Sequence, residues 1–196
     1  MKIIRLTLFA VVCLALGAIA GHKFALIQEE DRLERNKALV RRTHTAVWSE
    51  PNVPKATQAA RELYASAFVL HDWTGDDASG LPGVMKSVSG IRADFPDWSE
   101  RLESIVAEGD FVVDRYVSTG TQAHDLQPIP HHSPGVPSRG KSLRMPEMAM
   151  YRVVDGKIAE QWDFADIWGA EIQLGLYDPD HWTESVCGAR HEHTSR

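Results

Sequence analysis

The sequence predicts a single α+β domain in which helices come first and a curved antiparallel sheet follows. In the first half of the chain, apolar side chains recur at a spacing of about 3.6 residues, whereas the second half alternates or runs apolar in the manner of strands. Asp155-Gly156 separates the last two strand patterns, and Asp-Gly in such a position is the strongest short-range signal for a β-hairpin. The length of 196 residues suits one domain with its own core.

The sequence marks where the helices of the first half begin and end. The first is predicted over residues 25–50, where Pro51 ends the pattern, and the second begins at Asn52, which is a good N-cap. A short strand over residues 67–73 follows, because this segment is rich in β-forming residues and a Gly-Asp-Asp turn comes after it. A third helical pattern covers residues 81–95.

The second half is predicted to form four strands, over residues 101–108, 111–122, 142–154 and 157–165. A loop dense in Pro, Gly and His precedes the third strand, a short helix is expected over residues 167–176, and residues 177–196 form a polar tail. A curved sheet of this kind, wrapped around its helices, forms a cone with an open and partly apolar mouth. That shape is the usual geometry of a small-molecule site, so we expect a hydrophobic ligand or substrate.

The charge of the chain argues against a nucleic-acid partner. The formal net charge is -6, and the basic residues of the first helix are interleaved with acidic ones. Binding to phosphates needs a clustered basic face, which the sequence lacks.

Residues 1–20 read as a cleaved secretory signal peptide. Lys2 and Arg5 precede an uncharged apolar run, and Ala18 and Ala20 place small residues where a signal peptidase reads the chain. The run is shorter than the ~20 apolar residues of a spanning helix, so an uncleaved membrane anchor is the second interpretation. We therefore expect an exported protein, which contacts a membrane only if this segment is retained. Cleavage would leave Cys187 as the one cysteine and exclude an internal disulfide.

Eight short stretches in a fixed order resemble one known family. They are NKALV at 36–40 leading to VW at 47–48, FVLHD at 68–72, FPDW at 95–98, AEGD at 107–110, TGT at 119–121, YRVVDGKI at 151–158, EQWD at 160–163, and Asp166 with QLG at 173–175. Together they resemble the SnoaL-like polyketide cyclases, or ester cyclases, of the nuclear-transport-factor-two-like superfamily. The resemblance implies a cystatin-like roll over residues 26–176.

The resemblance also implies a chemistry without metal or cofactor. In such an aldol cyclisation a carboxylate removes a proton from a carbon next to a carbonyl group, and hydrogen-bond donors hold the enolate; dimers are common in the superfamily, so a homodimer is possible. The chain departs from the family pattern after Thr121, where similar proteins often have a histidine. Here Gln122 follows, His124 comes two residues later, and the loop is longer and contains His131 and His132. The identity of the substrate is therefore left open.

Two carboxylates at the end of the last predicted strand are the first candidates for the base. Asp166 is the first choice, because it corresponds best to the carboxylate that precedes the last helix of the family, and Asp163 is the second. At the rim of an apolar cone, burial would raise the pKa of either carboxyl group towards a useful range. The alternative is that Asp166 is only a helix N-cap and that Asp163 faces solvent.

His71 and Glu147 are further candidates. Strand alternation puts His71 on one face with Val69 and Trp73, where it could donate to an enolate or be a buried core histidine. Glu147 is a reserve candidate for the acid/base role, because it is the one charged residue in an apolar stretch. The register of the Asp-Gly hairpin predicts the residues that share its face: Ala149, Tyr151, Trp162 and Phe164.

The remaining histidines are not expected to bind metal. His44 lies on the apolar face of the first helix, from which it could reach the pocket from the opposite wall; the default prediction is a satisfied core histidine. The others lack a metal-ligand scaffold such as two histidines on one helical turn with an acid; they are His124, His131, His132, His191 and His193.

Two hypotheses on function follow from these observations. The chain is a cofactor-independent cyclase, or a related lyase or isomerase, that acts on a hydrophobic carbonyl compound. Alternatively, it is an exported binding module that captures such a compound in the same cone without turnover, an alternative that the predicted export favours.

The signal peptide can be tested directly. We expect the exported protein to begin at or near Gly21, because the small residues Ala18 and Ala20 precede that position. N-terminal sequencing of protein recovered outside the cytoplasm would measure this. A soluble cytoplasmic product that retains Met1 would contradict it.

Overall fold

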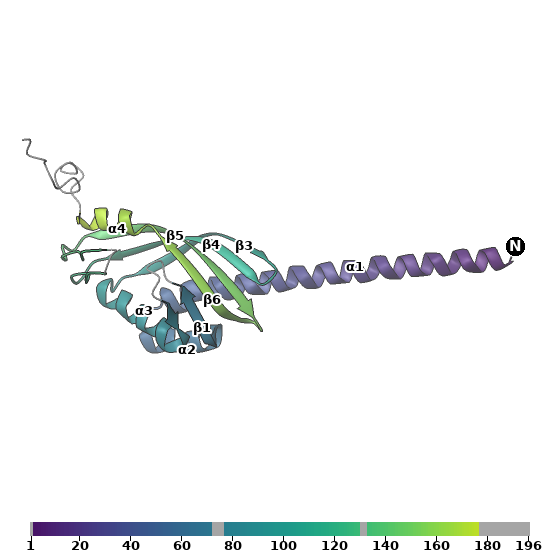
Figure 1. The fold of residues 1–196 in the computed structure, drawn as a ribbon, viewed down its shortest axis with the longest axis horizontal. Helices are drawn as coiled ribbons and strands as arrows, with labels where there is room; N and C mark the ends of the chain where they lie inside the picture. Colours follow the sequence, from purple (N-terminus) through teal and green to yellow (C-terminus); the bar gives the residue numbers. More distant parts are fainter. Residues whose placement is uncertain (1, 72–76, 130–132, 177–196) are drawn as a thin grey trace, which may run out of the picture.

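A curved sheet forms the body of the protein, and helices pack in the hollow of its concave side (Figure 1). The computed structural model describes residues 2–71, 77–129 and 133–176. Within these ranges the sheet has six strands in the order β2-β1-β6-β5-β4-β3. This α+β arrangement confirms the fold class that the sequence predicts.

The helices agree with the predicted order, although the first is longer than expected. In chain order they are α1 (Lys2–Thr43), the π-helix η1 (His44–Trp48), α2 (Val53–Leu63), α3 (Gly80–Asp94) and α4 (Ile167–Leu174). The N-terminal part of α1 projects far from the sheet, whereas its C-terminal part packs on β3 and β4 (Figure 1). The Asn52 side chain caps α2 by accepting a hydrogen bond from the Lys55 amide at 3.0 Å, as predicted.

The predicted signal segment forms the first part of α1. Among the residues that the structure describes, no helix contains a stretch both long and apolar enough to cross a membrane. Export and cleavage after Ala20 stay predictions.

The strands are close to the predicted ranges: β1 (Tyr64–His71), β2 (Ala78–Ser79), β3 (Ser99–Glu108), β4 (Phe111–Thr121), β5 (Ser142–Val154) and β6 (Lys157–Ala165). Strands β3 to β6 form the predicted antiparallel meander, but β1 joins β6 in parallel. The sheet is therefore mixed at this edge. Strand β2 was not predicted, because two residues are too few to show a period.

A β-bulge in the β5–β6 hairpin changes the predicted register. Next to the turn Val153 pairs with Ile158, but Arg152 then pairs with Glu160, so Ala159 is the extra residue. A slip of one residue exchanges the two faces of a strand. The prediction that Trp162 and Phe164 share a face with Glu147 is therefore wrong, and that face instead carries Gln161, Asp163 and Ala165.

Two apolar clusters fill the concave side of the sheet. The larger one joins the helices to the sheet and includes Val40, Val47, Phe68 and Tyr151. The smaller one lies near α4 and includes Phe95, Trp98, Leu143, Met145 and Leu174. Gly120 permits this second cluster, since a Cβ atom there would lie 2.9 Å from the Cβ of Phe95. Side chains from both clusters line the cavity described next.

Candidate active site

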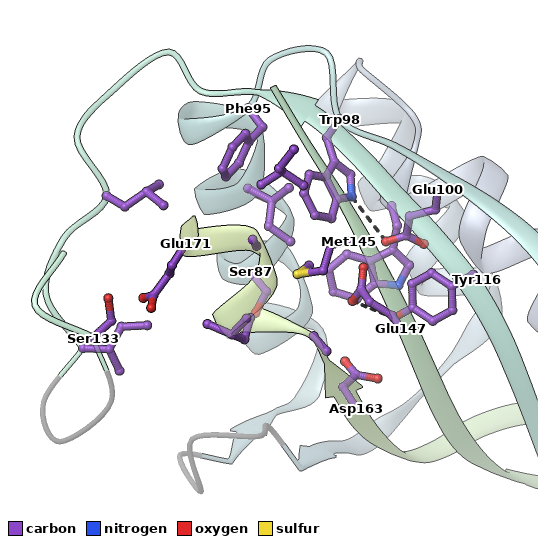
Figure 2. Close-up of a pocket in the computed structure, with 18 of the residues that line it drawn as sticks. Ser87, Phe95, Trp98, Glu100, Tyr116, Ser133, Met145, Glu147, Asp163 and Glu171 are labelled. Atoms are coloured by element: carbon purple, nitrogen blue, oxygen red, sulfur yellow. Dashed lines mark hydrogen bonds between the residues drawn. The ribbon is translucent and has the colours of Figure 1, made fainter. Parts of the chain in front are cut away.

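A cavity of about 350 Å³ opens between the two apolar clusters (Figure 2). Aromatic side chains form much of its wall: Trp48, Phe95, Trp98, Tyr116 and Tyr151. Within the described part of the chain, four carboxyl groups also line it, from Glu100, Glu147, Asp163 and Glu171. A pocket with mostly apolar walls and a few converging polar groups is the usual form of a small-molecule site.

Glu147 lies on β5 directly opposite Tyr116 of β4. The Tyr116 hydroxyl donates a hydrogen bond to Oε2 at 3.1 Å, while Oε1 is buried and has no hydrogen-bond partner among the described residues. Burial raises the pKa of Glu147 to about 8, and the charge of Glu100 adds to this rise. Ser118 lies near enough to oppose it, although its Oγ forms no hydrogen bond of normal geometry with the described groups. Glu147 is therefore mostly protonated at neutral pH.

Asp163 lies on β6, opposite Ala149 and therefore diagonal to Glu147 on the same face. Such diagonal neighbours are about 7–8 Å apart, so one substrate can contact both. The Gln161 side chain, which is 2% exposed, donates a hydrogen bond through Nε2 to Oδ1 of Asp163 at 2.8 Å. This bond fixes the orientation of the carboxylate.

His44 connects the helical layer to the sheet through two carboxylates. Its Nε2 lies 2.7 Å from Oδ2 of Asp114, and its Nδ1 lies 2.6 Å from Oε2 of Glu100. Burial alone would lower the pKa of His44, but Asp114 and Glu100 outweigh it and raise the pKa to about 10. Burial raises the pKa of Glu100, and His44 opposes this shift. The Trp98 indole also donates to Glu100, at 3.3 Å.

The sequence did not reveal this Asp114–His44–Glu100 triad. His44 is buried with both ring nitrogens paired, which confirms the prediction of a satisfied core histidine. Its partners, however, are 56 and 70 residues away. The one available signal was an acidic residue, Asp114, inside the apolar stretch FVVDRYV.

His71 lies outside the cavity. Phe68 and Leu70 occupy the inner face of β1, whereas His71 is on the outer face, where its ring stacks on Trp162 at a centroid distance of 4.9 Å. Its Nδ1 lies 3.1 Å from Oδ2 of Asp77. The structure therefore does not bring His71 to Glu147 and Asp163, and Trp73 is outside the described residues.

Asp166 also lies outside the cavity lining and instead caps α4. Its Oδ1 accepts a hydrogen bond from the Gly169 amide at 2.9 Å, and a Cβ atom at residue 169 would lie 2.2 Å from Oδ2. The side chain is thus turned towards the helix, as the N-cap alternative predicted. Of the four residues selected from the sequence, the structure brings only Asp163 and Glu147 together in the cavity.

Residues 2–71, 77–129 and 133–176 contain no group of three His, Cys, Asp or Glu side chains placed to hold a metal ion. The predicted histidines at 131, 132, 191 and 193, and Cys187, lie outside these ranges.

Comparison with known proteins identifies the family. The family model of the SnoaL-like polyketide cyclases matches residues 38–174, well over half of the chain. The chain belongs to this family. No curated protein matches the sequence.

Solved structures agree with the SnoaL-like fold. A candidate SnoaL-like polyketide cyclase from Jannaschia sp. CCS1 has a TM-score of 0.62 at 20% identity, covering 74% of this chain and 95% of that one. A candidate polyketide cyclase from Acidithiobacillus ferrooxidans has a TM-score of 0.58 at 28% identity, covering 74% and 96%. A protein of ketosteroid isomerase-like fold from Catenulispora acidiphila, solved with trimethylamine, has a TM-score of 0.55 at 16% identity, covering 72% and 97%.

Gln122, which directly follows β4 in this SnoaL-like chain, is a buried anchor. Gln122 is 2% exposed, and its Nε2 donates a hydrogen bond to the carbonyl oxygen of Val136 at 2.8 Å. The bond ties Val136 of the loop after β4 back to the end of that strand. Leu126, Ile129 and Ser133 of this loop line the cavity.

The charge state of His44 can be tested by NMR. Because its folded pKa lies above the ordinary value of 6.5, the triad should stabilise the fold fully below pH 6.5 and progressively less as the pH rises to about 10. We expect the His44 ring to remain protonated at pH 8 and to titrate near pH 10, with its signals assigned by their loss in His44→Gln. Titration near pH 6.5 would show that the two carboxylates do not hold the proton.

Proposed function

We propose that the protein catalyses proton transfer at a carbon next to a carbonyl group, as in the aldol cyclisation of a hydrophobic polyketide-type compound. One observation carries the proposal: Glu147 and Asp163 are diagonal neighbours on the cavity wall and have different surroundings. Paired carboxyl groups in different environments can take the roles of acid and base.

Glu147 is the acid and donor. Its Oε2 accepts the Tyr116 hydroxyl, so the carboxyl proton belongs on Oε1, the oxygen without a protein partner in the described structure. From there it can donate a hydrogen bond to a carbonyl oxygen of the substrate. The same bond strengthens when the carbonyl oxygen becomes an enolate oxygen, which favours the transition state over the bound substrate.

Asp163 is the base. The Gln161 amide donates a hydrogen bond to Oδ1 and orients the carboxylate, which accepts the proton of the substrate C–H group. The enolate carbon then attacks a second carbonyl carbon of the same molecule, and the new alkoxide takes up the proton that Asp163 received. One carbon–carbon bond forms and no atom is added, so the reaction balances without oxidant, metal or cofactor.

The walls of the cavity support the choice of a hydrophobic substrate. A volume of about 350 Å³ is at the small end of the range for ligand pockets, and aromatic and aliphatic side chains make up most of the lining. The same walls would also serve the alternative, an exported binding module that retains its ligand without turnover.

The base can be tested by substitution. With 2-tetralone as probe in D₂O, we expect the protein to accelerate deuterium exchange at the α-carbon, and Asp163→Asn to reduce the rate on the order of a hundredfold or more. Asp166→Asn is the matched comparison, because Asn still caps a helix and Asp166 lies outside the cavity lining. A loss of rate in Asp166→Asn instead would favour the residue chosen from the sequence. Binding of the probe without any exchange would favour the binding module.

The pH dependence of the same exchange tests Glu147. Because the protonated form is the donor and its pKa is about 8, the rate should fall as the pH rises through 8. In Glu147→Gln the fall in rate near pH 8 should disappear, while part of the exchange rate should remain, since Gln provides an N–H donor that does not titrate. A rate that rises through pH 8 would mean that Glu147 is the base rather than the acid.

A further inference from the structure

The cavity has an unusual charge balance. Its described lining includes the four carboxyl groups of Glu100, Glu147, Asp163 and Glu171 and contains no Lys, Arg or His. Glu100, Glu147 and Asp163 come from the sheet, and Glu171 comes from α4 (Figure 2). A site that takes up an anion would need the opposite arrangement, with basic side chains or backbone amides turned inwards.

Two basic side chains near the cavity, those of His44 and Arg92, already have protein partners. His44 contacts both Asp114 and Glu100, so the three groups together carry a net negative charge when the carboxylates are ionised. Arg92 donates to the carbonyl oxygens of Trp98 at 2.7 Å and Trp48 at 2.6 Å. Neither cation lines the cavity.

Gln161 provides a second and independent observation. The Asp163 carboxylate can only accept, so the amide of Gln161 must direct its N–H group towards it. The amide oxygen Oε1 is then the free end, and it is buried without a hydrogen-bond partner in residues 2–71, 77–129 and 133–176. Because Gln161 lines the cavity, a bound ligand that donates a hydrogen bond can satisfy this oxygen.

The aromatic walls suit the same kind of ligand. The faces of Trp and Tyr rings attract a cation within about 6 Å, and the attraction is stronger where water is excluded. Trp98 and Tyr116 both adjoin carboxyl groups of the cavity, since each donates a hydrogen bond to one of them.

We infer that the cavity binds an apolar carbonyl compound that also carries a protonated amine. The ammonium N–H donates to Gln161 and to the carboxylates, and its alkyl groups contact the aromatic rings. The inference rests on the proposed function only in taking this cavity as the site.

A cationic substrate also removes a difficulty of the proposed reaction. Proton transfer to Asp163 moves the negative charge from that carboxylate onto the enolate oxygen, and the described lining offers no basic side chain to stabilise it there. An ammonium group on the same substrate supplies the missing positive charge.

Two pairs of benzoate esters test the preference, with dissociation constants measured from tryptophan fluorescence at pH 7. The first pair is 2-(dimethylamino)ethyl benzoate, protonated at this pH, and its neutral isostere 3-methylbutyl benzoate. The second is benzoylcholine and 3,3-dimethylbutyl benzoate. We expect each cation to bind about tenfold or more tightly than its isostere. Equal affinities within the pairs would overturn the inference.

Variants locate the preference in this cavity. The double variant Asp163→Asn, Glu171→Gln should bring each ratio close to one, whereas Glu108→Gln, which removes an exposed charge at the end of β3, should leave it unchanged. Gln161→Leu should weaken the dimethylammonium ester more than benzoylcholine, because only the former has an N–H group. Circular dichroism confirms that each variant is folded. If the double variant retains the full ratio, the cation binds elsewhere and the inference is wrong.

The outcome is separable from that of the proposed function. Absence of deuterium exchange with 2-tetralone would contradict the catalytic proposal but would not affect the ratios of dissociation constants within the ester pairs. Equal binding within the ester pairs, with exchange intact, would remove only the ligand class.

Discussion

The Asp114–His44–Glu100 triad is the interaction on which the site depends. It joins the π-helix at the end of α1 to β3 and β4, and it is almost fully buried. A buried charge needs a partner, and loss of one member of such a group costs about 3–5 kcal/mol because the others remain without compensation. The triad also positions the cavity wall: Glu100 is itself part of the lining, and the His44 ring packs on Tyr116 at a centroid distance of 4.6 Å. Tyr116 in turn holds Glu147.

The same burial that makes carboxyl groups costly gives them their chemistry. In an apolar wall the charged form of Glu147 is disfavoured, so the group keeps its proton at neutral pH and can act as a donor. Asp163, two rungs along the sheet, has an amide partner that favours a hydrogen-bond acceptor. The electrostatics of the cavity therefore follow from which acidic side chains the sheet turns inwards.

The chain belongs to the SnoaL-like family and has its fold, and the loop after β4 adds side chains to the wall of the cavity. Gln122 holds that loop by a buried hydrogen bond, so the loop side chains become part of the cavity wall. The four carboxyl groups of the described lining set the charge that a ligand encounters. Shape and charge are thus contributed by different parts of the chain.

The sequence by itself determined the order of helices and strands, the Asn52 cap and the β5–β6 hairpin, because periodicity, capping and turn chemistry act between residues close in the chain. Tertiary structure alone decided which side chains meet. The bulge at Ala159 turns Asp163 inwards in place of Trp162, although the hairpin turn is the predicted one. The partners of His44 come from strands more than fifty residues away, and Asp166 turns to its own helix. Register and long-range pairing depend on how the whole sheet packs, and no local pattern records that.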